Sequence, residues 1–367
     1  MLASGDAMTS WRSNRAAHLL GIDYPIIQAP FGGFPSQQLT ATVSNMGGLG
    51  SFGAVTLTSS AIREVVGELR SLTDKPFAIN LWVSTSDREA SHIRAETIEQ
   101  KIRELGQCYA ELDIEPPLAA GFKSQDFEEQ VQAAIDADVP VLSFIYGIPP
   151  LEILDECRRR RIQTIGTATT PEEAIALQEA GLNLVVASGF EGGGHRGSFL
   201  QPATDSLMGG LSLIPQVVDA VEVPVIAAGG IADGRGVVAA LALGAEAVQI
   251  GTAFLACAGS GASTEYRAAL RSLAAKRTHL TDAFTGRLAR GIKNHLMDEL
   301  KHGSSPPLPF PVQHVLTQTI ARPASTKGRV ELMTIWAGQS ASLCHHTEAG
   351  KFMASLIAET DAFLSKY

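Results

Sequence analysis

Short apolar runs alternate with amphipathic stretches along the chain up to about residue 255. Eight of the runs are typical of buried parallel strands, and we predict strands at Pro25–Gln28, Gly48–Ser51, Phe77–Leu81, Val141–Phe144, Gln163–Ile165, Leu184–Ala187, Val225–Ala227 and Ala247–Ile250. The amphipathic stretches between most of them predict helices at Gln37–Met46, Ser60–Leu72, Phe127–Ala137, Leu151–Arg160, Pro171–Ala180, Leu213–Ala220 and Arg235–Leu243.

Several of these helices have recognisable start and stop signals. Thr170 and Pro171 supply an N-cap residue and a first-turn proline, and Asp233 is a second N-cap. Gly181 and Gly244 follow the last turns of their helices, as C-terminal glycines do.

Eight strands that alternate with helices predict a (β/α)₈ TIM barrel. A doubly wound open sheet is the alternative, because the pattern does not show whether the sheet closes. Two stretches fall outside the alternation: a polar helical insertion at Ser84–Glu115 and a long helical and loop tail from His279. We therefore predict an N-terminal segment (1–20), a barrel that holds the functional site (21–278) and a C-terminal extension (279–367) that packs on the barrel.

Composition narrows the choice of partners. Hydrophobic residues make up 45% of the 367 residues and charged residues 18%, and the net charge is −9. An acidic chain of this kind disfavours nucleic acid or an anionic membrane as the main partner, since both attract basic surfaces. The one basic run, Arg158–Arg161, falls at the end of a predicted helix, where cations suit the helix dipole.

The four cysteines are far apart in the sequence, without a C-x-x-C motif. Reduced thiols are the simple interpretation, and with no signal peptide or apolar run of spanning length we expect a cytoplasmic protein. Cys344, His345 and His346 look like a fragment of a metal site but lack spaced partners, so no metal is predicted.

The chemistry concentrates in three glycine loops. The segment Gly189-Phe-Glu-Gly-Gly-Gly-His-Arg-Gly197 follows the sixth strand, Gly229-Gly230 follows the seventh, and Gly251-Thr252 follows the eighth. Barrels commonly bind phosphate with the loops after strands seven and eight, through backbone N–H groups, and Thr252 adds a hydroxyl. The pattern thus predicts a phosphorylated cofactor beside His195, a base with a pKa near physiological pH.

Each of these residues also has a plain structural interpretation. His195 could bond only the backbone of its turn, and Asn80, at the end of the third strand, could cap local backbone or meet a flat heterocycle. For Glu191 the sequence favours a structural role over a catalytic one. For Arg196 two roles remain possible: it could offset the charge of a substrate, or it could simply face solvent.

At these motifs the chain resembles the class I nitronate monooxygenases, formerly called 2-nitropropane dioxygenases, which are FMN-dependent barrels. The resemblance is carried by the motifs Ile27-Gln-Ala-Pro30, Phe77-Ala-Ile-Asn80, Gly166-Thr-Ala-Thr-Thr170, Glu191–Gly197, Ala227–Asp233, Gln249-Ile-Gly-Thr252, Gly286-Arg-Leu-Ala-Arg-Gly291 and Trp336-Ala-Gly-Gln339.

The resemblance implies that His195 is the catalytic histidine. It implies an FMN site, to which we assign Ala29, Pro30, Phe31, Asn80, Ser188, Gly193, Gly194, Gly229, Gly230, Gln249, Ile250, Gly251 and Thr252. At three of these positions the family often has another residue: methionine in place of Phe31, glutamine in place of Ser188 and alanine in place of Gly193.

The activity that the resemblance implies is FMN-dependent oxidation of alkyl nitronates by O₂ to an aldehyde or ketone and nitrite. The sequence leaves open the oligomeric state, the natural nitro compound and the turnover of neutral nitroalkanes. An FMN-dependent enoyl-acyl carrier protein reductase using NAD(P)H is the main alternative. An inosine monophosphate dehydrogenase would need a cysteine in the loop that carries Gly-Gly-Gly-His here, and a non-catalytic FMN-binding protein is disfavoured by the intact histidine loop.

Overall fold

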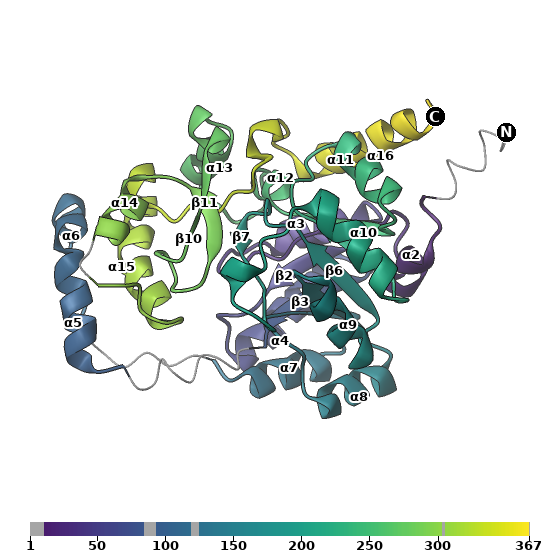
Figure 1. Ribbon diagram of the computed structural model, residues 1–367, viewed down its shortest axis with the longest axis horizontal. Coiled ribbons are helices and arrows are strands. Elements are labelled where there is room, and N and C mark those ends of the chain that lie inside the picture. Colours follow the sequence, from purple (N-terminus) through teal and green to yellow (C-terminus); the bar gives the residue numbers. More distant parts are fainter. Residues whose placement is uncertain (1–10, 84–92, 119–124, 303–304, 367) are drawn as a thin grey trace.

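Eight parallel strands form the central sheet of the computed structural model, which describes residues 11–83, 93–118, 125–302 and 305–366 (Figure 1). The strands are β1 (Ile26–Gln28), β2 (Gly50–Gly53), β3 (Phe77–Trp82), β4 (Val141–Ile145), β5 (Gln163–Ala168), β6 (Leu184–Ser188), β8 (Val225–Ala228) and β9 (Ala247–Ile250). Their order is β1-β9-β8-β6-β5-β4-β3-β2.

The two edges of this sheet meet and close it. The N–H of Gln28 donates to the carbonyl of Leu49 (2.9 Å), and the N–H of Leu49 donates to the carbonyl of Ile26 (3.0 Å). The sheet is therefore a barrel, which confirms the predicted fold class and excludes the open doubly wound sheet.

The helices lie around the barrel and in a lobe beyond one of its ends. They are α2 (Arg15–Leu20), α3 (Gln37–Asn45), α4 (Ser59–Leu72), α5 (Ala95–Glu104), α6 (Gly106–Leu112), α7 (Phe127–Asp136), α8 (Leu151–Arg160), α9 (Pro171–Glu179), α10 (Gly210–Ala220), α11 (Gly234–Ala242), α12 (Thr252–Leu255), α13 (Thr264–Leu270), α14 (His295–His302), α15 (Val312–Thr326) and α16 (Ala349–Leu364). The predicted caps form: Thr170 accepts from the N–H of Glu173, and Asp233 accepts from those of Arg235 and Gly236.

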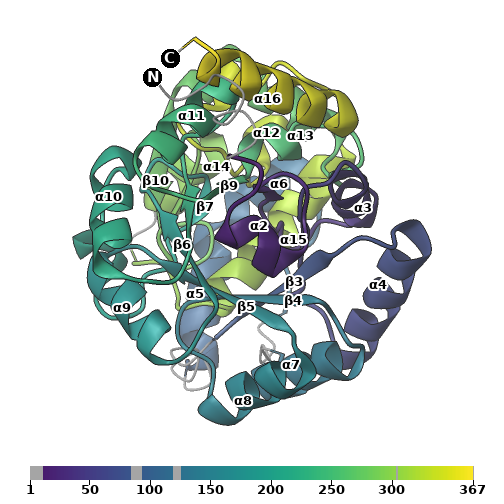
Figure 2. The same ribbon diagram turned by 90° about the vertical axis from the view of Figure 1, so that its right-hand side faces the viewer.

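Helix α2 closes the amino end of the barrel (Figure 2). Its Ala16, Ala17 and Leu20 are buried in one apolar cluster with side chains of the barrel interior such as Ile27 and Val186. This cluster fills the barrel below the level at which the glycine loops leave the strands.

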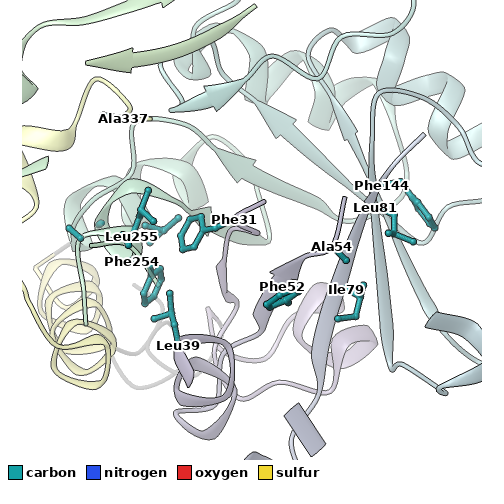
Figure 3. Packing of buried hydrophobic residues seen from close by; sticks show 14 of the residues in the cluster. Phe31, Leu39, Phe52, Ala54, Ile79, Leu81, Phe144, Phe254, Leu255 and Ala337 are labelled. Atoms are coloured by element: carbon teal, nitrogen blue, oxygen red, sulfur yellow. The ribbon is translucent and has the colours of Figure 1, made fainter. Parts of the chain in front are cut away.

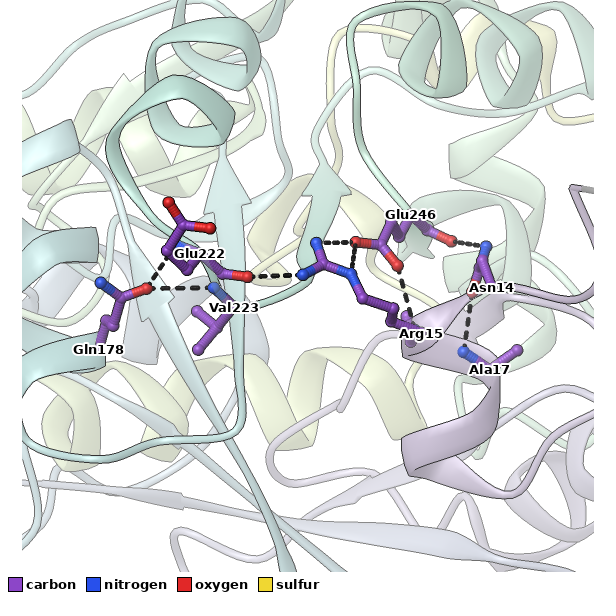
Figure 4. A network of polar contacts seen from close by, with 8 residues as sticks. Asn14, Arg15, Ala17, Gln178, Glu222, Val223 and Glu246 are labelled. Atoms are coloured by element: carbon purple, nitrogen blue, oxygen red, sulfur yellow. Dashed lines mark hydrogen bonds and ion pairs between the residues drawn. The ribbon is translucent and has the colours of Figure 1, made fainter.

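Polar contacts around α2 hold it in this position (Figure 4). Arg15 donates from Nε to Glu246 (2.9 Å) and from Nη1 to the carbonyl of Glu222 (2.8 Å). Asn14 caps the helix by accepting from the N–H of Ala17 (2.9 Å), and its Nδ2 donates to the carbonyl of Glu246 (2.6 Å).

The helical layer of the barrel is completed from the far end of the sequence. Helix α16 packs against α11 and α3, and Phe352 of α16 contacts Phe254 of α12 with ring centroids 4.8 Å apart. Figure 3 shows the neighbouring part of the core, where Phe254 and Leu255 of α12 lie close to Leu39 of α3 and Phe31 after β1. The boundaries predicted at residues 21 and 279 stay a prediction, while α16 itself belongs to the ring of helices.

The insertion after β3 and the tail pack together in the second lobe (Figure 1). Tyr109 of α6 hydrogen-bonds Thr319 of α15 (2.9 Å), and the buried Lys101 of α5 donates to the carbonyl of Ser305 (2.9 Å). A small antiparallel sheet lies between the lobe and the barrel, in the order β10 (Thr278–Thr281), β11 (Ala289–Ile292) and β7 (Gly194–His195). The helical insertion is thus confirmed in α5 and α6, while its residues 84–92 lie outside the described part of the chain.

Candidate active site

A cavity of about 530 Å³ lies at the carboxyl end of the barrel, where the three glycine loops leave β6, β8 and β9. It is lined by His195 and by most of the residues assigned to the cofactor site, namely Ala29, Pro30, Phe31, Asn80, Ser188, Gly193, Gly194, Gly229, Gly230, Gln249, Gly251 and Thr252. Ile250 is the exception, because its side chain is 1% exposed and packs in the core. Loops that are distant in sequence therefore share one cavity, as the strand count predicts.

His195 is held by the tail and not only by its own glycine loop. Gly194 and His195 form β7, which pairs with Arg290 and Ala289 of β11 in the small antiparallel sheet. The glycines before it let the chain turn from β6 into this pairing. Residues of the C-terminal tail thus fix the backbone of the candidate catalytic histidine.

The ring of His195 sits among aromatic side chains. Its centroid is 5.0 Å from that of Trp82 and 5.1 Å from that of Trp336, and Nε2 lies 2.9 Å from Oγ1 of Thr285. Loss of solvent is the main cause that lowers the pKa of His195 to about 3, with smaller contributions from His314 and Arg287. The pKa predicted from the sequence, near physiological pH, is therefore wrong, because the ring is buried. The imidazole is therefore neutral at neutral pH, with a lone pair available to a substrate.

A strap of the tail, residues 336–340, ties the three glycine loops together. The N–H of Gly338 donates to Oγ1 of Thr252 (2.9 Å), and that of Gln339 donates to the carbonyl of Glu191 (2.9 Å). The hydroxyl of Ser340 donates to the carbonyl of Gly230 (2.7 Å). The motif that begins at Trp336 therefore has a structural role, because it holds the three glycine loops in position around the cavity.

Two of the glycines are required by their surroundings. Gly230 has φ +72°, and a Cβ there would lie 3.0 Å from Cγ of Glu191. A Cβ on Gly193 would lie 2.5 Å from the backbone nitrogen of Gly338. An alanine at position 193, frequent in the family, would thus require the strap to shift, so glycine suits the closer contact seen here.

The two charged residues of the histidine loop support the backbone. Glu191 accepts from the N–H of Gly210 (2.7 Å), so it caps α10 from a distance and explains why this helix starts before the predicted Leu213. Arg196 is 2% exposed and donates to the carbonyls of Ser188 (2.8 Å) and Gly189 (2.8 Å). The solvent-facing position of Arg196 is therefore wrong, because its guanidinium is buried and holds the loop through two carbonyls, while a role in offsetting substrate charge stays a prediction.

Asn80 is buried at the edge of the cavity, and its Nδ2 donates to the hydroxyl (2.9 Å) and to the carbonyl (3.2 Å) of Ser143. Among the residues that the structure describes, Oδ1 of Asn80 has no hydrogen-bond donor. This amide oxygen is the group that a ligand can use, so the buried side chain has both a structural anchor and a free acceptor.

Several residues of the site carry no local sequence signal. Trp82 and Phe310 flank the cavity, His314 lines it from α15, and Thr285 meets His195 from the turn before β11. Of the aromatic side chains around His195, Trp336 does lie in a quoted motif, but that motif only marked the family resemblance and predicted no role for the tryptophan. The others could be found only from the packing of the second lobe on the barrel.

Two features are absent from the part of the chain that the structure describes. In that part of the chain, no three His, Cys, Asp or Glu side chains gather as they would around a metal ion. No helix there is long and apolar enough to cross a bilayer. The cytoplasmic location stays a prediction.

The four cysteines are buried free thiols, and burial raises the pKa of each; they are Cys108, Cys157, Cys257 and Cys344.

The comparison with known families agrees with this geometry. The family model described as nitronate monooxygenase matches residues 13–359. The chain belongs to the nitronate monooxygenase family. It is accordingly an oxidoreductase.

Individual relatives are similar over almost their whole length. A protein named probable nitronate monooxygenase from Staphylococcus saprophyticus is 38% identical over 356 residues, which cover 96% of this chain and 99% of the relative. The solved structure of nitroalkane oxidase from Streptomyces ansochromogenes is 36% identical with a TM-score of 0.87, covering 96% of this chain and all of that one (100%). FabK from Thermotoga maritima is more distant, at 27% identity and a TM-score of 0.75 over 96% of this chain and 98% of that one.

Proposed function

We propose that this member of the nitronate monooxygenase family oxidises alkyl nitronates with FMN and O₂, releasing an aldehyde or ketone and nitrite. The observation that carries the proposal is His195, a neutral imidazole held at the wall of a cavity that three glycine loops line. The family match and the similarity to a nitroalkane oxidase support the same substrate class.

The residues around the cavity fit FMN. Gly229, Gly230 and Gly251 expose backbone at the ends of β8 and β9, where barrels commonly hold phosphate, and the hydroxyl of Thr252 lies with them. The space beside Gly194, where a Cβ would lie, holds no other atom within 4 Å, so a ligand in the cavity could approach the backbone there. Oδ1 of Asn80 offers an acceptor to a ring N–H, and the alternation of donors and acceptors on a flavin ring suits such an amide.

When bound, FMN would supply the electron-accepting chemistry and the reaction with O₂. The chain's own residues hold the substrate. Trp82, Phe310 and Trp336 give the cavity aromatic walls that exclude water around the reacting carbon. His195 can hydrogen-bond the nitro group, and its lone pair can accept an α-proton from a nitroalkane. Because a pKa of about 3 makes this imidazole a weak base, we expect preformed nitronates to react faster than neutral nitroalkanes.

Anaerobic rapid mixing tests the proposal. The purified yellow protein is mixed with an alkyl nitronate and, in separate runs, with NADH and NADPH, while the absorbance of oxidised flavin is followed. We expect the nitronate to lower that absorbance within the turnover time and the nucleotides to leave it unchanged on that scale. Rapid bleaching by a nucleotide with no response to nitronate would overturn the proposal and favour the enoyl reductase.

A further inference from the structure

The hydroxyl of Thr285 makes three hydrogen bonds in the turn before β11. Oγ1 lies 2.9 Å from Nε2 of His195, donates to the carbonyl of Arg287 at 3.2 Å and accepts from the N–H of Arg287 at 3.3 Å. A hydroxyl has one hydrogen and two lone pairs. The hydrogen points to the carbonyl, which can only accept, and one lone pair takes the Arg287 N–H.

The lone pair that remains faces Nε2, so the hydrogen between these two atoms must belong to the imidazole. Neutral His195 is then protonated on Nε2 and bare on Nδ1. In the opposite arrangement Thr285 would leave the Arg287 carbonyl, and Nδ1 would carry a hydrogen. Among the described residues Nδ1 has no hydrogen-bond partner, so that hydrogen would lack an acceptor from the protein. The first arrangement satisfies every group of the turn.

The turn itself keeps the hydroxyl in this orientation. Gly286 has φ +80°, and a Cβ there would collide with the carbonyl oxygen of Leu308, so the chain passes too close to the 308–310 segment for any other residue. The guanidinium of Arg287 lies 4.2 Å from the ring centroid of Tyr146 and 4.6 Å from that of Phe310. Thr285 is 1% exposed, so neither its side chain nor the backbone that it bonds has room to turn.

We propose that Thr285 is a positioning residue that holds His195 as the Nε2–H tautomer and thereby makes Nδ1 the base for neutral nitroalkanes. The proposal rests on the function proposed above. In the step that it describes, the α C–H bond breaks, its hydrogen bonds to Nδ1, and its electron pair moves into the nitro group. The products are a nitronate anion and an imidazolium that donates from Nε2 to Thr285.

The same feature separates two substrate classes. A nitronate has already lost its α-proton and needs no base, so the tautomer of His195 matters little to its entry into the reaction. A neutral nitroalkane needs the bare Nδ1. Thr285 therefore governs the rate with neutral nitroalkanes and has little effect on the rate with preformed nitronates.

Nitrogen NMR of the full-length holoprotein tests the tautomer directly. The chain has nine histidines, and with ¹⁵N-labelled histidine the signals of His195 are those that disappear in His195→Gln. We expect a protonated Nε2 and a bare Nδ1 in the wild type and in Thr285→Ser. In Thr285→Val, which removes the hydroxyl at nearly constant volume and leaves an Nε2–H without an acceptor, we expect the Nδ1–H tautomer to predominate. An Nδ1–H tautomer in the wild type, or an unchanged Nε2–H tautomer in Thr285→Val, would overturn the proposal.

Steady-state kinetics with a nitroalkane and with its preformed nitronate give the functional arm. We expect Thr285→Val to lower kcat/KM for the nitroalkane by about 10²-fold, as loss of a general base does, and kcat/KM for the nitronate by less than about threefold. Thr285→Ser should restore the nitroalkane rate. An equal loss on both substrates would show a merely structural residue and reject the proposal. If Thr285→Val is not folded, Thr285→Ala removes the same hydroxyl.

The two arms separate this proposal from the proposed function. The NMR result requires no turnover, so it stands or falls independently of whether nitronate reduces the flavin. A protein that keeps the Nε2–H tautomer but is bleached only by NADH or NADPH would contradict the nitronate assignment and, with it, the role of Nδ1.

Discussion

The two ends of the barrel differ in composition and in packing. The amino end is filled by α2, whose Leu20 and Ala16 pack among the interior side chains and whose capping residue bonds the turn before β9. The carboxyl end is made of glycine loops around a cavity, and its buried polar groups include Asn80 and Arg196. Apolar side chains fill the amino end, whereas the carboxyl end, which holds the proposed active site, is hollow and is supported from outside by the tail. The comparison teaches that a barrel can be closely packed at one end of its strands while the other end keeps space for the proposed site.

The largest expected effect is loss of the cofactor from the hollow end. Gly230→Val puts a branched side chain at φ +72°, against Cγ of Glu191 and the strap. We expect pale protein that keeps its circular dichroism, measured beside the flavin content after gel filtration. Gly67→Val is the matched control, because a Cβ on Gly67 of α4 meets no atom within 4 Å. Full yellow occupancy in Gly230→Val would show that FMN does not use this loop.

The next effect concerns the histidine. His195→Asn should lower nitroalkane turnover by about 10²–10⁴-fold, the usual range for a lost general base, while FMN stays bound. Nitronate turnover should fall much less, because that substrate has no α-proton left to remove. Parallel assays of both substrates on the same preparation measure the ratio. Equal nitroalkane rates in variant and wild type would remove His195 from the mechanism.

At the amino end the same kind of experiment should change stability and leave chemistry alone. Leu20→Ala opens a cavity in the cluster under α2, where Leu20 is 2% exposed, and should cost about 2–5 kcal/mol of unfolding free energy. Leu19→Ala on the same helix removes a side chain that is 39% exposed and should cost less than about 0.5 kcal/mol. Urea unfolding gives both values. A change in kcat/KM of folded Leu20→Ala would mean that the two ends are coupled.

Acid should weaken the hollow end first. Burial lowers the pKa of His314 from 6.5 to about 4, with Arg322 adding to the shift. Between these values the unfolded chain binds a proton at His314 that the folded chain refuses, so stability is lost as the pH falls from 6.5 to 4. His314→Gln should lack this part of the loss, which is on the order of a few kcal/mol, whereas His279→Gln, at an exposed side chain of β10, should keep it. Unfolding midpoints at several pH values give the comparison, and identical slopes in wild type and His314→Gln would contradict it.

The smallest expected effect is at the cap of α2. Asn14→Ala removes the acceptor for the Ala17 N–H and the donor to Glu246, and should cost about 0.5–2 kcal/mol. Asn14→Ser keeps an acceptor for the Ala17 N–H and loses only the donor to Glu246, so it should cost less. If both variants unfold at the same urea concentration as the wild type, the closure of the amino end depends on apolar packing alone.

The repeating part of the fold was predictable because each strand and helix has a local cause. Apolar runs such as Val225–Ala227, and caps such as Asp233, act over a few residues and are visible in the sequence. The glycine loops could be assigned to one cavity because the ends of parallel strands meet in a barrel.

The rest depends on contacts between distant parts of the chain. The early start of α10 follows from Glu191, which caps it from another loop. The position of Arg196 could not be predicted, since only the fold brings its guanidinium to the carbonyls of Ser188 and Gly189. Thr285 meets His195 through the pairing of β7 with β11, and no local pattern marks such a pairing.

The position of α16 has a consequence for how the chain acquires its shape during synthesis. This helix closes the ring between α11 and α3, and the strap just before it aligns the glycine loops. A growing polypeptide on the ribosome therefore has all eight strands long before it can finish the ring of helices. The pocket is assembled last, so a chain cut short before residue 336 would have neither the strap nor α16. Such a fragment would expose the apolar sides of α3 and α11, a surface suited to chaperones and proteases, before it could hold a cofactor.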